Sequence, residues 1–161
     1  MRNNIFHLPS RSTSSIFHLT SYINNMFNAK VYTVSIPSSG VALEEEHIAR
    51  EVIARWNIEE GEKHGVVFLT IPSNYKGITP DIYIFAIDNY VDEQKVEVAI
   101  QTGAKVMLFF RSHHDEKNTI ESEVRRIEEL RAMMLGKCEC VDYNNKSGFE
   151  AALEELLSQQ K

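Results

Sequence analysis

Four carboxylates lie close together in the stretch "DNYVDEQKVE", which directly follows an apolar segment: Asp88, Asp92, Glu93 and Glu97. Glu93 and Glu97 are four residues apart, so on a helix they share one face and are placed for acid–base or nucleophilic work. Asp88 and Asp92 flank the start of that helix and are candidates to bind a ligand hydroxyl. A solvated helix face contains the same residue types, and this alternative stays open.

A second candidate is the stretch "PSSG" (37–40), where Ser38 and Ser39 precede a predicted helix. Two hydroxyls and the free backbone donors of a helix start suit a phosphate or a ribose. The spacing matches neither G-x-G-x-x-G nor a P-loop, and a plain helix N-cap is the alternative.

A third polar stretch is "RSHHDE" (111–116), in which two histidines and an aspartate could act as bases or metal ligands or form a solvated turn. No Cys or His pair at zinc spacing accompanies it. We therefore predict no metal site and no cofactor.

The elements that must position these groups follow from hydrophobic periodicity. Runs rich in apolar and β-branched residues predict strands at 31–36, 66–71, 81–87, 105–110 and 137–143. Amphipathic runs predict helices at 41–57, 92–102, 121–135 and 147–160, and residues 58–65 are the expected exit loop of the first. In that first helix the pattern puts Ile48, Val52 and Trp56 inward and Glu45 largely off the apolar face.

Strands that are apolar throughout, alternating with amphipathic helices, predict a five-stranded, mainly parallel sheet covered on both faces, a three-layer α/β sandwich. Only nine residues, 72–80, join the second and third strands, which is too few for the usual crossover helix. Either an antiparallel pair or an extended loop is expected there, and the parallel arrangement is preferred. Ligands bind such sheets at the carboxyl ends of the strands, near a topological switch point.

Composition excludes several classes of protein. Seventeen basic and twenty-three acidic residues give a net charge of −6, which argues against nucleic acid as a partner. No apolar run reaches the roughly 18 residues of a membrane helix, so no membrane partner is expected. Cys138 and Cys140, the two cysteines, point to one face of a predicted strand as small core residues, which fits a reducing, cytoplasmic location. The alternative is that they contribute two ligands to a metal, but no Cys or His pair at zinc spacing completes such a site.

The first 30 residues differ from the rest of the chain in charge. They contain no acidic residue, since the first one in the sequence is Glu44. Apolar residues recur there at helical spacing: Ile16, Leu19, Ile23, Met26 and Phe27. We therefore divide the chain into an extension, 1–30, and an α/β domain, 31–161. The extension is expected to be a helix that packs on the domain or on a partner chain; a cleaved targeting peptide is the alternative.

Several blocks resemble a family of TIR-like domains of unknown function that are often fused to defence or signalling NTPases. The blocks are "VSIPSSGVALEEEHIAREVIARWN", "DIYIFAI", "AIQTGAKVMLFF" and the terminal "FEAAL", and together they cover most of residues 31–160. The family typically has S-S-P-G-D followed by E-E-R in the first block. Its wider relatives include TIR domains and nucleoside deoxyribosyltransferases, so the resemblance implies a flavodoxin/TIR-like fold.

The resemblance also implies a pocket for a nucleotide or nucleoside, cleaved at its N-glycosidic bond with the help of a helix glutamate. Glu97 or Glu93 would be that glutamate, with Ser38 and Ser39 on the ribose or phosphate. The chain departs from the family in lacking the aspartate of the first block and in the shortness of the connection 72–80. Alignment on Ala99 and Gly103 further places Lys95, and not a glutamate, at the carboxylate position.

Two functions follow. The first is a non-catalytic or degenerate TIR-like module that binds a nucleotide or assembles, as a homo-oligomer or with a partner protein, through the N-terminal helix, in a defence or signalling system. The alternative is an N-glycosidase acting on NAD or a nucleoside.

Overall fold

The computed structural model describes residues 28–37, 43–88, 92–112 and 120–160. In chain order the elements are β1 (Lys30–Ser35), α2 (Leu43–Glu59), α3 (Gly61–His64), β2 (Val66–Ile71), β3 (Ile82–Ile87), α4 (Glu93–Gln101), β4 (Lys105–Arg111), α5 (Glu121–Met134), β5 (Glu139–Tyr143) and α6 (Lys146–Ser158). The five predicted strands and four predicted helices are therefore present, and the strands lie within about two residues of the predicted positions. The expected exit loop is wrong in one respect, because the four-residue helix α3 forms inside it.

The five strands form one sheet in the order β2-β1-β3-β4-β5, and every neighbouring pair is parallel. The predicted parallel α/β sheet is thus confirmed. The antiparallel alternative for the connection 72–80 is wrong, because β2 and β3 are not neighbours and β1 lies between them. The chain reverses its direction of travel across the sheet between β1 and β3, which makes this the topological switch point.

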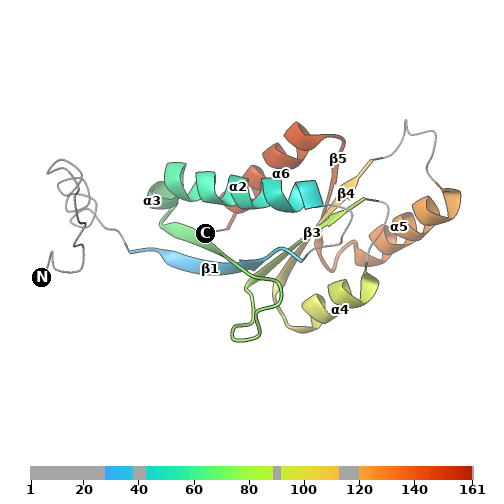
Figure 1. Cartoon of the computed structure of the whole chain (residues 1–161), viewed down its shortest axis with the longest axis horizontal. Helices are drawn as coiled ribbons and strands as arrows, with labels where there is room; N and C mark the ends of the chain where they lie inside the picture. The colour runs from blue at the N-terminus through green and yellow to red at the C-terminus, as the bar shows by residue number, and fades with distance from the viewer. Residues whose placement is uncertain (1–27, 38–42, 89–91, 113–119, 161) are drawn as a thin grey trace, which may run out of the picture.

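Helices cover both faces of the sheet (Figure 1). The upper face is covered by α2, α3 and α6 and the lower face by α4 and α5, while the connection 72–80 runs below the sheet beside α4. Successive side chains of a strand point to opposite faces of the sheet. Ile82 and Ile84 therefore belong to the upper core, and Phe85 and Ile87 belong to the lower core. The usual helix between β2 and β3 is replaced by this extended segment.

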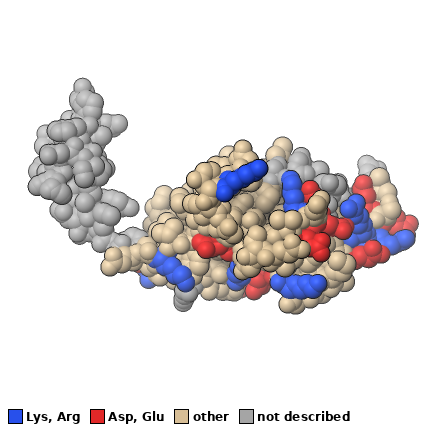
Figure 2. Space-filling model, turned by 90° about the horizontal axis from the view of Figure 1, so that it is seen from below, with Lys and Arg blue, Asp and Glu red and all other residues tan. Residues whose placement is uncertain are grey.

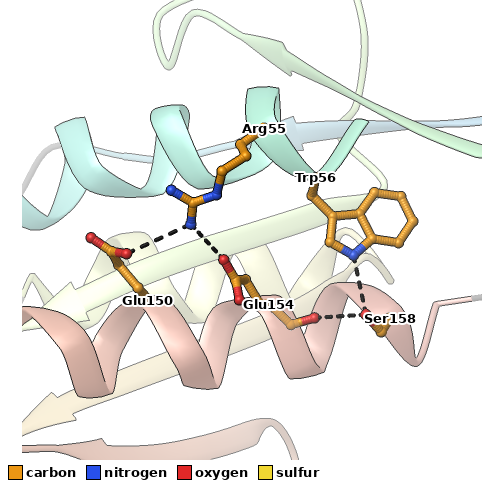
Figure 3. Close-up of polar contacts among 5 residues, drawn as sticks. All are labelled: Arg55, Trp56, Glu150, Glu154 and Ser158. Atoms are coloured by element: carbon orange, nitrogen blue, oxygen red, sulfur yellow. Dashed lines mark hydrogen bonds and ion pairs between the residues drawn. The ribbon is translucent and has the colours of Figure 1, made fainter. Parts of the chain in front are cut away.

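Two contacts hold α2 against α6 on the upper face (Figure 3). The buried indole of Trp56 donates through Nε1 to Ser158 Oγ at 3.1 Å. The preceding residue of α2, Arg55, places its guanidinium between Glu150, at 3.6 Å, and Glu154, at 2.5 Å, on α6. The Trp56–Ser158 hydrogen bond satisfies a buried donor, whereas the ion pairs are exposed to solvent and contribute less to stability.

A third contact joins α2 to the outer strand of the sheet. The amide of Asn57 donates to the Phe68 carbonyl at 2.8 Å and accepts from the Phe68 N–H at 2.9 Å. Phe68 lies on β2, which is at the end of the sheet, and it pairs in register with Tyr32 of β1 on its inner side. Asn57 therefore satisfies both backbone groups of one outer-strand residue.

Among the described residues, no helix is both long and apolar enough to cross a membrane.

Candidate functional site

A cavity of about 580 Å³ opens on the lower face beside the switch point. Its walls come from the end of β1, the start of the connection 72–80, β3 and α4, and its lining residues are Ser35, Pro37, Ser73, Asn74, Tyr83, Phe85, Asp92, Gln94, Lys95, Val98 and Ala99. The cavity exists because no helix of the described chain fills the place between β2 and β3 on this face. Its volume falls within the range of about 300–1,000 Å³ that is usual for small-molecule sites.

Two aromatic rings of β3 line the cavity. Tyr83 and Phe85 are two residues apart, so both point to the lower face, and their ring planes lie 15° apart with centroids separated by 6.2 Å. Phe85 is buried, whereas Tyr83 is half-buried. The two rings offer an apolar surface on which a flat ligand can stack.

Polar residues at the start of α4 also line the cavity. Asp92 caps this helix, because its side chain accepts a hydrogen bond from the Lys95 N–H at 3.3 Å. Asp92 and Lys95 line the same cavity, as do the polar residues Ser35 and Asn74. A carboxylate that accepts from hydroxyls and a cation that attracts a phosphate therefore stand beside an aromatic surface.

The two predicted catalytic glutamates lie elsewhere on α4. Neither Glu93 nor Glu97 lines the cavity. Glu93 accepts a hydrogen bond from Arg126 of α5 at 2.9 Å, and Glu97 is exposed. Lys95, which the alignment placed at the family's carboxylate position, lines the cavity together with Gln94, Val98 and Ala99 of the same helix.

The other predicted site residues divide into three groups. Asp92 lines the cavity, whereas Asp88 lies on the upper face, where Arg111 Nη1 donates to its Oδ2 at 3.2 Å. Ser38 and Ser39 lie outside the described residues. The same holds for the histidines and aspartate of residues 113–115.

A polar cluster that the sequence did not predict lies at the carboxyl edge of the upper face. Tyr143, at the end of β5, donates through its hydroxyl to Glu45 Oε1 at 3.1 Å, and both residues are buried. Burial, the Glu45 carboxylate and Asp88 all raise the pKa of Tyr143 above its ordinary value, while Arg111 opposes them. The expectation that Glu45 lies off the buried face of its helix is therefore wrong, because Tyr143 supplies a partner for its carboxylate.

The two cysteines are free and half-buried, and both pack against the lower core, as predicted. Burial raises the pKa of each thiol, so both stay protonated near neutral pH. Within the part of the chain that the structure describes, no three His, Cys, Asp or Glu side chains are grouped as metal ligands.

No protein-family model and no curated protein sequence matches this chain. The resemblance to the TIR-like family therefore rests on the quoted blocks alone, whereas the fold that it implied is present. Among solved structures, apo translation elongation factor SelB from Methanococcus maripaludis is 12% identical with a TM-score of 0.49, over 81% of this chain and 36% of that one. The chain thus spans about a third of the elongation factor.

Two smaller proteins are also similar. A short-chain flavodoxin associated with a non-canonical PDU bacterial microcompartment is 11% identical with a TM-score of 0.45, over 83% of this chain and 99% of that one. A de novo designed Rossmann 2x3 protein is 18% identical with a TM-score of 0.44, over 80% of this chain and 90% of that one. At these identities and TM-scores none of the three says which ligand or activity belongs to this chain.

Sequence reasoning named neither Ser35 nor Tyr83 as a site residue, and it gave Lys95 only as the residue at the family's carboxylate position. One signal was available, because the connection 72–80 is too short for a helix and so predicts an uncovered patch of sheet. The alternation of β3 then assigns Tyr83 and Phe85 to a common face. Which of the two faces would be uncovered depends on the strand order, which the sequence does not state.

Proposed function

We propose that this protein binds a nucleoside monophosphate, without cleaving it, in the cavity between β3, α4 and the connection 72–80. The observation that carries the proposal is the combination of an aromatic surface, a carboxylate and a lysine around one cavity at the switch point. In parallel sheets of this order, that point is where nucleotide ligands bind.

Each part of a nucleotide has a chemically suitable partner on this wall. A base can stack on Tyr83 and Phe85, since every base has a π-face. Ribose hydroxyls can donate to the Asp92 carboxylate, and a phosphate suits the Lys95 ammonium. The cavity volume of about 580 Å³ is compatible with a ligand of this size.

The placement of the α4 glutamates favours binding over cleavage. An N-glycosidase requires an ionised carboxylate next to the anomeric carbon. Glu93 is turned toward Arg126 of α5, and neither it nor Glu97 is among the lining residues. A domain that binds a nucleotide and does not turn it over suits a sensor or assembly module in a signalling or defence system, as the TIR-like resemblance implies.

The proposal is tested by titrating the full chain with AMP and with adenosine in a calorimeter. Replacing Lys95 by Ala is expected to weaken AMP binding about tenfold and leave adenosine binding unchanged, because only AMP carries the phosphate. Replacing Tyr83 by Leu is expected to weaken both ligands by a similar factor, since stacking contributes about 1–3 kcal/mol per base.

Two controls make the result specific. Lys137→Ala removes an equally charged, exposed residue that does not line the cavity, and both affinities should stay unchanged. Incubation with NAD should release no nicotinamide. Release that disappears in a Glu93→Gln, Glu97→Gln double variant would instead establish a glycosidase, and failure to bind either probe would overturn nucleotide recognition here.

A further inference from the structure

Two exposed apolar side chains lie on the lower face of β1 and β2, beside Thr33, whose hydroxyl donates to the Asp81 carboxylate at 3.0 Å. Tyr32 and Phe68 stack on the upper side with ring centroids 5.7 Å apart, so their neighbours Val31 and Leu69 point to the lower side. Each of these two side chains is 52% exposed. Seen from below, charged side chains are dense at the end formed by α5 and sparser near β1 (Figure 2).

The connection 72–80, which also runs below the sheet, contributes two further exposed apolar side chains, because Tyr75 is 52% exposed and Ile78 is 47% exposed. No helix of the described chain lies below β1 and β2, whereas α4 and α5 cover the lower face farther along the sheet. Several exposed apolar side chains on one side of a sheet favour a docking site there.

The residues that precede β1 have the pattern and length to cover it. Residues 16–27 repeat apolar side chains at helical spacing, and only Asn28 and Ala29 separate them from the first residue of β1. A helix of twelve residues is about 18 Å long, and a strand of six residues spans about 20 Å. A two-residue link between a helix and the next strand is normal in α/β folds.

The chain's own architecture selects the lower face. Above β1 and β2 the space is filled by α2, whose Trp56 meets Phe68 edge to face at a centroid distance of 5.0 Å. On the lower face, α4 already packs in this way before β4, which it joins through residues 102–104. A helix that precedes β1 would repeat this helix-to-strand arrangement.

We propose that residues 16–27 form a helix that packs, within the same chain, on the lower face of β1 and β2 against Val31, Leu69 and the connection 72–80. It supplies the cover that a crossover helix between β2 and β3 would otherwise give. The proposal concerns the surface beside the cavity and does not depend on the ligand.

Amide hydrogen exchange of the full chain, followed by mass spectrometry, tests this proposal. Residues 16–27 are expected to exchange at least tenfold more slowly than residues 1–12. Leu69→Asp should remove that protection, whereas Met133→Asp, which places the same charge on an exposed position of α5, should leave it intact.

Variants within the segment give a second measurement that does not touch the described fold. Ile23→Asp should raise the binding of an apolar dye to the exposed face, and Asn25→Asp, on the opposite side of the expected helix, should not. Amides of α6 report whether each variant remains folded.

Three outcomes would overturn the proposal. Fast exchange throughout residues 1–27 means that the isolated chain leaves this face open for another protein. Protection that declines as the chain is diluted places the segment on a second copy. Protection that survives both Leu69→Asp and Ile23→Asp means that the segment packs somewhere else.

Discussion

Tyr143 and Glu45 are 98 residues apart in sequence, yet their hydrogen bond ties the first turn of α2 to the end of β5. Replacing Tyr143 by Phe leaves a buried carboxylate without this donor. We expect a loss of about 1–3 kcal/mol in the free energy of unfolding, measured by urea denaturation at pH 8. A Tyr83→Phe variant, which removes a half-buried hydroxyl on the other face, should change stability much less.

The stability difference between wild type and Tyr143→Phe should depend on pH in one direction. The native state holds the pKa of Tyr143 above that of the unfolded chain, which is about 10. The contribution is therefore complete below pH 10 and is lost as pH rises, because only the unfolded chain releases the proton. The wild-type advantage should shrink by about 1.4 kcal/mol per pH unit above 10, and a constant difference up to pH 11 would contradict this assignment.

The contrast between Glu45 and Ile48 shows what residue patterns predict. Ile48 is apolar and recurs with the helical period, so its burial follows from local sequence. Glu45 is buried because a tyrosine from β5 reaches it, and no local pattern contains that information. The same limit applies to Lys95, whose place in the cavity follows from the register of α4 against β3.

The interface between α2 and α6 contains both a buried hydrogen bond and exposed ion pairs, so their contributions to stability can be compared (Figure 3). Ser158→Ala leaves the Trp56 N–H buried without this acceptor and should lower the free energy of unfolding by about 1–2 kcal/mol at any salt concentration. Arg55→Ala should have a smaller effect that fades in 1 M salt, because screening weakens exposed pairs. Denaturant titrations at low and high salt compare the two variants, and equal salt sensitivity would contradict this division.

Strands and helices were predictable here because each is defined by its own periodicity. β3 and β4 are apolar throughout, which predicts burial on both faces and hence a parallel sheet. For the connection 72–80, the sequence predicted only that it is too short for a helix. Its length does not determine the position of β2 in the sheet. Because β2 lies outside β1, the connection must cross below the sheet, and this crossing makes the cavity.

The whole molecule keeps two different environments at the carboxyl edge of its sheet. Above the sheet, Glu45, Tyr143, Asp88 and Arg111 form ion-pair and hydrogen-bond contacts in a largely buried region. Below it, the cavity is bounded by an extended segment instead of a helix. We therefore expect the upper side to resist change and the lower side to adapt to a ligand, since elements with fewer buried contacts open more easily.

The amide of Asn57 has a consequence for how copies of this chain behave when they meet. An outer strand with open backbone groups is a template on which another strand can add, and such addition leads to aggregation. At Phe68 both groups are already taken, so a second chain finds no continuous ladder along β2. Asn57→Ala should make light scattering and thioflavin fluorescence rise with protein concentration, whereas Ile58→Ala, its exposed neighbour, should not. The Asn57 amide would then protect the chain against fibre formation.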